Sequence, residues 1–90
     1  MDIENLKNEL KNKNLKGYNI VQTTSQNLVL FKSKYKYTDC IYINIGENKA
    51  YVKMDRVFDN KFFYNRIERM FINENICKSS DELMKYIGLN

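Results

Sequence analysis

Histidine and proline are absent from this sequence, and cysteine occurs only twice, at Cys40 and Cys77. Histidine is the side chain most often used as a general base near neutral pH, so its absence argues against acid–base catalysis. A nucleophilic cysteine needs such a base beside it, and we therefore expect both cysteines to be packing residues with free thiols. The sequence predicts no catalytic residue, no cofactor and a protein that is not an enzyme.

Long apolar runs are also absent. No stretch approaches the roughly 20 apolar residues that a membrane-spanning helix needs. The charged start, Met1-Asp2-Ile3-Glu4, does not resemble a secretory signal and favours a cytoplasmic location. Asp39 followed by Glu47-Asn48-Lys49 matches a pattern of metal-dependent nucleases, in which Glu-x-Lys lies on a central strand. Here that triplet falls in a predicted turn, so no metal site is expected.

Positive charge is present, and lysine carries most of it. Fifteen basic and eleven acidic side chains give a net charge of +4, and only three of the basic residues are arginine. Abundant lysine and asparagine without proline are typical of AT-rich coding sequences, which accounts for part of this charge. A basic surface nevertheless attracts polyanions. With 90 residues, 43% of them hydrophobic, the chain is expected to form a single domain over residues 1–90.

Apolar residues that alternate between Tyr18 and Arg56 predict an antiparallel meander of three or four strands. A reversal over Glu47-Asn48, or over a longer loop at 46–49 in the same register, pairs Ile45 with Ala50, Ile43 with Val52 and Ile41 with Met54. A reversal over residues 34–37 pairs Leu30 with Ile41, Leu28 with Ile43 and Lys32 with Asp39. The two reversals agree on one apolar face.

That face consists of Leu28, Leu30, Ile41, Ile43, Ile45, Ala50, Val52 and Met54. A register slip of one residue would turn every one of these side chains to the opposite face, so the pattern specifies the pairing strongly. A first strand over Tyr18–Thr23 is expected to extend the sheet. Because Ile20 and Val21 both suit a buried position, the pattern leaves its register open.

Three helices are predicted around the meander. The first covers Asp2–Lys16 and ends at Gly17, the second runs from Asp59 or Asn60 to about Asn75, and a loop at 76–78 follows. Ser79 and Glu82 form a capping-box pattern that opens a third helix, which ends at Gly88. The predicted fold class is α+β, with one N-terminal and two C-terminal helices mainly on one face of the sheet.

Two features predict a binding surface. The hairpin tip at 34–37 presents two lysines and two tyrosines that could contact a partner. Alternatively, it is a solvated lysine-rich turn whose charge keeps the sheet from aggregating. The second sheet face is either open for contact or covered by the N-terminal helix. Together these features give the predicted partner-binding residues: Phe31, Lys34, Tyr35, Lys36, Tyr37, Tyr42, Tyr51 and Lys53.

The opening Met1-Asp2-Ile3-Glu4-Asn5-Leu6 and the following Glu9-Leu10-Lys11-Asn12-Lys13 resemble the start of a small phage anti-CRISPR protein. The length and the predicted element order are similar too. The resemblance implies a non-enzymatic inhibitor that docks on a nuclease and imitates DNA with clustered carboxylates. This chain is net basic and has no acidic cluster beyond Asp81-Glu82, so none of the contact residues of that family transfers.

Two functions follow as hypotheses. The first is a non-enzymatic binding protein of phage or mobile-element type that docks on a host protein or nucleoprotein complex and inhibits it. The second is an accessory protein that binds DNA or RNA through the basic, tyrosine-rich hairpin. The salt dependence of binding distinguishes these two functions. Affinity for phosphates falls steeply as ionic strength rises, whereas affinity for a protein partner depends on ionic strength much less.

Overall fold

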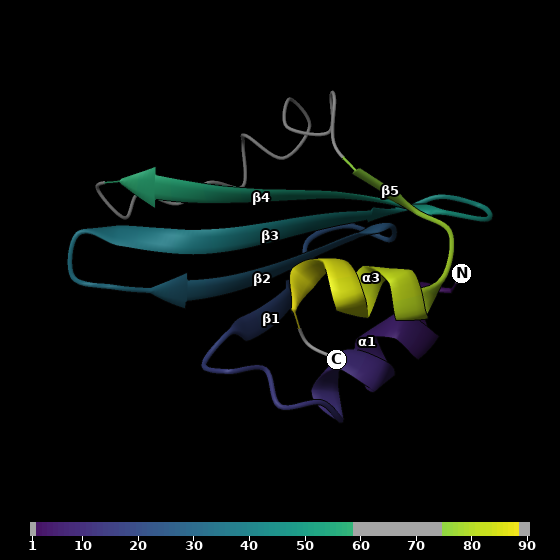
Figure 1. Cartoon of the computed structure of the whole chain (residues 1–90), viewed down its shortest axis with the longest axis horizontal. Helices are drawn as coiled ribbons and strands as arrows, with labels where there is room; N and C mark the ends of the chain where they lie inside the picture. Colours follow the sequence, from purple (N-terminus) through teal and green to yellow (C-terminus); the bar gives the residue numbers. More distant parts are fainter. Residues whose placement is uncertain (1, 59–74, 89–90) are drawn as a thin grey trace.

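The computed structural model describes residues 2–58 and 75–88 (Figure 1). A five-stranded antiparallel sheet forms its centre, and the strands follow one another in chain order across it. Its strands are β1 (Asn19–Gln22), β2 (Asn27–Ser33), β3 (Tyr37–Ile45), β4 (Ala50–Phe58) and β5 (Asn75–Cys77). The helices are α1 (Ile3–Lys11) and α3 (Ser80–Ile87). The predicted α+β class is confirmed, with five strands in place of three or four.

Both predicted hairpin registers are confirmed. Leu30 lies opposite Ile41 in the β2–β3 pair, and Ile41 lies opposite Met54 in the β3–β4 pair. The β3–β4 connection is the loop at 46–49, closed by a 2.7 Å hydrogen bond that the Gly46 N–H donates to the Lys49 carbonyl. The alternation of apolar residues along each strand therefore determined the pairing, as expected for a sheet with a buried face.

Strand β1 resolves the register that the sequence left open. Ile20 pairs with Leu30 and Val21 with Val29, so these two neighbours lie on opposite faces. Ile20 packs against the same cluster as Leu30, and Val21 packs against a second cluster on the other side. Both residues are partly buried because both faces of the sheet carry apolar clusters.

Strand β5 was not predicted. Residues 76–78 were expected to form a loop, but Asn75–Cys77 pair with Ala50–Val52 at the edge of the sheet beyond β4. A strand of three residues is too short to show an alternating pattern. Cys77 is nonetheless buried in the main core, whereas Ile76 is 51% exposed.

Helix α1 is shorter than predicted. Asp2 caps its N-terminus by accepting from the Glu4 N–H, and the helix ends at Lys11 rather than Lys16. Asparagine side chains compete with the backbone for hydrogen bonds, and the Asn14 side chain accepts from the Lys16 N–H in the following turn. Gly17, at φ +92°, turns the chain into β1 instead of ending the helix.

Helix α3 matches its prediction. Ser79 accepts from the Glu82 N–H at the N-terminus, and Gly88 adopts the left-handed conformation that ends the helix. The predicted helix from Asp59 or Asn60 lies outside the described residues, except that its expected last residue, Asn75, begins β5.

Both described helices pack on the same face of the sheet (Figure 1). Leu6 and Leu10 of α1 and Leu83 and Met84 of α3 cover the predicted apolar face. Fully burying a leucine stabilises the fold by about 1.5–3 kcal/mol. Of the eight predicted core residues, only Met54 is wrong: 47% of its surface is exposed.

Candidate docking surface at the hairpin end of the sheet

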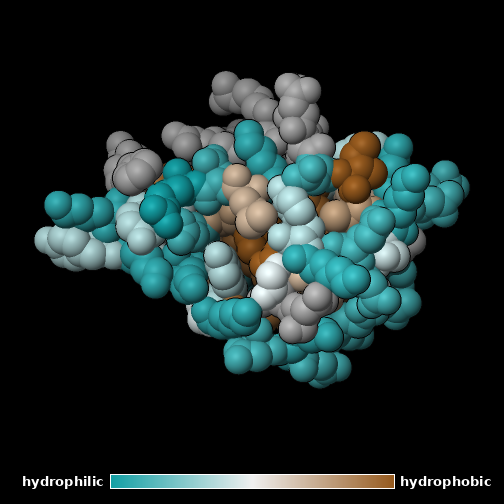
Figure 2. Space-filling view, in the orientation of Figure 1, coloured by the Kyte–Doolittle hydropathy of each residue, from teal (hydrophilic) through white to brown (hydrophobic). Residues whose placement is uncertain are grey.

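The helices cover only part of their face of the sheet. They lie over the end near the β3–β4 loop, and neither α1 nor α3 reaches the end near the β2–β3 hairpin (Figure 1). Seen from this side, apolar atoms gather in a central hollow among hydrophilic ones (Figure 2). We use the name hairpin-end surface for the part of this face between the two helices and the β2–β3 hairpin; it consists of Tyr18, Lys32, Tyr37, Asp39, Ile41, Met54 and Arg56.

A shallow groove of about 390 Å³ crosses this surface, lined by Tyr18, Asp39, Cys40, Ile41, Met54, Asp55 and Arg56. Ile41 and Met54 are cross-strand partners, and Ile41 is 2% exposed. Met54 lies beside it but beyond the reach of the helices, which explains why a residue in correct core register is half exposed. The groove thus has an apolar floor and a charged rim.

Arg56 is held in place on this rim. Its guanidinium carbon lies 4.0 Å from the centroid of the Tyr37 ring. Its Nε donates to Asp39 Oδ1 at 2.7 Å and Nη2 to Oδ2 at 3.4 Å, and this bond raises the pKa of Arg56. Stacking and a two-bond contact together orient a guanidinium more firmly than either alone.

Lys32 forms a second cation–aromatic pair on the same surface. Its Nζ lies 4.6 Å from the centroid of the Tyr18 ring and donates to the Lys16 carbonyl at 3.1 Å. Burial, followed by the nearby Asp39 carboxylate, raises the pKa of Tyr18. The phenol therefore stays neutral at physiological pH.

The hairpin tip projects beyond the groove. Tyr35 is 91% exposed, between the exposed residues Lys34 and Lys36. The Lys36 ammonium lies 5.9 Å from the Tyr35 ring centroid, and the Lys34 N–H donates to the Tyr37 carbonyl at 2.7 Å. The tip is therefore a tight turn that presents one aromatic ring and two cations to solvent.

The sequence left two alternatives for the second sheet face: a surface open for contact, or a face covered by the N-terminal helix. Tyr42 is completely buried in a cluster with Val29, Cys40 and Val57. Phe31, Tyr51 and Lys53 are partly buried. The expected cover, α1, packs on the opposite face, so neither alternative describes this side fully. Tyr42 is not available to a partner in this structure.

Sequence reasoning missed Tyr18, Met54 and Arg56 as surface residues. The register did contain a signal, because Arg56 falls opposite Asp39 and two residues beyond Met54 on the same face. The missing information was where the helices end over the sheet. That depends on the crossing of α1 and α3, which no local pattern specifies.

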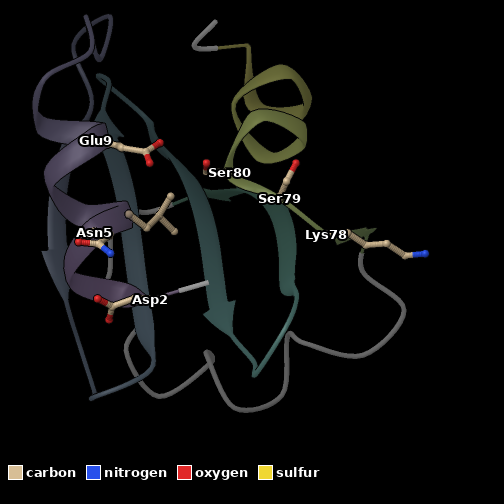
Figure 3. A pocket seen from close by; sticks show the side chains of 7 residues that line it. Asp2, Asn5, Glu9, Lys78, Ser79 and Ser80 are labelled. Atoms are coloured by element: carbon tan, nitrogen blue, oxygen red, sulfur yellow. The ribbon is translucent and has the colours of Figure 1, made fainter.

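A second hollow, of about 280 Å³, lies between α1 and the start of α3 (Figure 3). Asp2, Asn5, Leu6 and Glu9 line one side, and Lys78, Ser79 and Ser80 the other. Glu9 points toward α3, and the Lys78 side chain points away from the hollow (Figure 3). Asp2 and Ser79 already cap their helices, so the polar groups here mainly serve the fold.

No group of three His, Cys, Asp or Glu side chains within residues 2–58 and 75–88 could hold a metal ion. Burial raises the pKa of Cys40 to about 11 and also raises that of Cys77, which keeps both thiols protonated and unreactive.

Among the described helices, none is long and apolar enough to cross a membrane. No protein-family model, curated protein or solved structure matches the chain.

Proposed function

We propose that this protein is a non-enzymatic binding protein that docks on a protein or nucleoprotein partner through the hairpin-end surface and the tip. The exposure of Tyr35, at 91%, carries the proposal. A tyrosine at a tight turn contributes nothing to a core, whereas tyrosine is among the residues that dominate binding at protein interfaces. The protein would inhibit its partner by covering a surface that the partner needs for its function.

The groove supports docking on a protein. Half-exposed Met54 lies opposite Ile41, in the middle of β3, and Tyr37 at the start of that strand adjoins the turn that bears Tyr35, so β3 connects the apolar hollow with the aromatic projection. A partner that filled the groove would bury Met54 and restore the cover that the helices provide elsewhere. Lys32, Tyr37 and Arg56 would form the polar rim of such an interface.

Direct binding of DNA or RNA is the second candidate, and the tip favours it. Exposed lysines on both sides of an exposed ring can neutralise phosphates while the ring stacks on an unpaired base. On the hairpin-end surface, however, Tyr18 and Tyr37 each have one ring face occupied by a cation of the chain itself, at 4.6 and 4.0 Å. A base would have to displace Lys32 or Arg56 to stack there, so we rank this function second.

Photocrosslinking tests the first function. A photoreactive phenylalanine analogue replaces Tyr35 in cells of the natural host, and the same analogue at Asn48, in the exposed loop at the opposite end of the sheet, is the control. We expect discrete protein adducts from position 35, which Met54→Gln abolishes, and none from position 48. Identical adducts from both positions would contradict docking through the hairpin end.

Salt dependence tests the second function. Binding of random single-stranded DNA and RNA is measured by fluorescence anisotropy over a series of salt concentrations. Direct binding predicts that log K falls with log salt by roughly 0.7–0.9 per phosphate contacted. Absence of measurable binding near about 0.1 M salt would remove this function, since contacts with phosphates supply most of such affinity.

A further inference from the structure

We infer that the groove of the hairpin-end surface binds an acidic protein segment, in which a carboxylate side chain lies next to a large apolar one. The carboxylate would pair with Arg56, and the apolar side chain would cover Met54. This inference rests on the proposed docking function and specifies the chemistry of the partner. It depends on the geometry of Arg56, the apolar floor of the groove and the charge around it.

Arg56 has the geometry to receive a carboxylate. Asp39 engages Nε and Nη2, whereas Nη1 makes no hydrogen bond with any other described residue. The side chain is 51% exposed, and its stack on Tyr37 holds the plane of the guanidinium. An arginine fixed in this way loses little conformational entropy when it binds, which favours a planar anion at its remaining edge.

The floor of the groove favours an apolar neighbour for that carboxylate. Met54 is 47% exposed and lies against Ile41, and Asp39 and Arg56 line the same hollow. Methionine adapts its shape to the side chain packed against it, which suits a docking position. A nucleic acid offers a phosphate but no aliphatic side chain for this floor, so the groove fits a protein segment better.

The charge around the groove selects an acidic segment. Lys32, Lys34, Lys36 and Arg56 belong to the hairpin end, against Asp39 and Asp55. Asp39 is already paired with Arg56, and Asp55 accepts a bond from the Arg56 backbone N–H. The surplus of cations attracts acidic partners and disfavours a second copy of this chain, whose net charge is also positive.

A peptide selection with the full chain tests the inference. A displayed library of random peptides is selected at about 0.15 M salt, where exposed charges are screened beyond about 8 Å. We expect enriched peptides to carry Asp or Glu beside Leu, Ile, Met or an aromatic residue. Arg56→Gln and Met54→Gln should each weaken their binding about tenfold or more, as for central interface residues.

Matched control variants distinguish loss of the contacts in the groove from a general loss of positive charge or of apolar surface. Lys85→Gln removes one positive charge from the exposed side of α3, and Ile76→Gln removes a half-exposed apolar side chain from β5. Both should leave peptide binding unchanged. Arg56→Lys retains the charge but not the planar fork, and it should lose most of the affinity.

Three outcomes would overturn the inference: no enriched peptide, enriched peptides without acidic residues, or acidic peptides whose affinity Arg56→Gln and Met54→Gln do not change. The crosslinking experiment at Tyr35 then shows which idea has failed. Protein adducts at position 35 would leave docking intact and reject only the acidic segment. Loss of the adducts as well would reject the proposed function.

Discussion

The side chains of Ile20 and Val21 are neighbours in β1 but pack into different apolar clusters, one on each face of the sheet. On the side of Ile20 the cluster includes residues from α1 and α3. On the side of Val21 it is centred on Val29, Cys40, Tyr42 and Val57. Each face of the sheet therefore carries a buried apolar cluster, and the residues of both clusters should contribute to stability.

Tyr42 tests the second cluster. Because its side chain is completely buried, Tyr42→Ala should lower the free energy of unfolding by about 3–5 kcal/mol, the cost of deleting a large core aromatic. Tyr35→Ala at the exposed tip is the matched control and should change it by less than about 0.5 kcal/mol. Urea denaturation measures both. Equal effects would show that the second face is not a core.

Met54 and Ile43 lie on the same sheet face but differ in cover. Ile43→Ala should cost about 2–5 kcal/mol, because the helices leave it no exposed surface. Met54→Ala removes a side chain that is half exposed and should cost less than about 1 kcal/mol, since little of its surface is transferred from water on folding. A loss at Met54 as large as that at Ile43 would mean that the groove is closed in solution.

The buried thiol of Cys40 should make the free energy of unfolding fall at alkaline pH. The pKa of its thiol is about 11 in the folded protein and 9.0 without burial, so the unfolded chain loses its proton first as the pH rises. The contribution is complete below pH 9 and disappears progressively toward pH 11. Urea midpoints at pH 8 and at pH 10.5 should therefore differ less in Cys40→Ala than in the unchanged protein. Parallel losses in both proteins would exclude this thiol as a cause.

Ser79 anchors the last helix by capping. Ser79→Ala removes the oxygen that accepts from the Glu82 N–H at 3.2 Å and should cost about 0.5–2 kcal/mol. Ser80→Ala, one residue later and inside the helix, makes no such change and should be neutral or slightly stabilising. Circular dichroism during thermal unfolding distinguishes the two variants. A neutral Ser79→Ala would show that the cap contributes nothing to α3.

Much of the fold could be predicted because it depends on local alternation. The β2–β3 and β3–β4 registers follow from which apolar residues face each other across short turns, and α3 follows from Ser79, Glu82 and Gly88. Strand β5 could not be predicted in this way. Its three residues are paired with a strand distant in sequence, so tertiary contacts determine its conformation.

The candidate docking surface was predicted only in part, for a related reason. The hairpin tip follows from the register, and Tyr35, Lys34 and Lys36 are exposed as expected. Burial of Tyr42 and exposure of Met54 depend instead on what covers each face of the sheet. Period-two patterns show that two side chains share a face, but they do not show how far along the strands that face is covered.

The position of β5 has a consequence for synthesis on the ribosome. Strands β1 to β4 pair with their neighbours in sequence and can form as they emerge, whereas Ala50–Val52 must wait for residues 75–77. Leu83 and Met84, which close the main core, arrive later still. We expect a nascent chain that ends before β5 to expose this core, bind a chaperone and be degraded quickly, which limited proteolysis of stalled ribosome complexes would reveal.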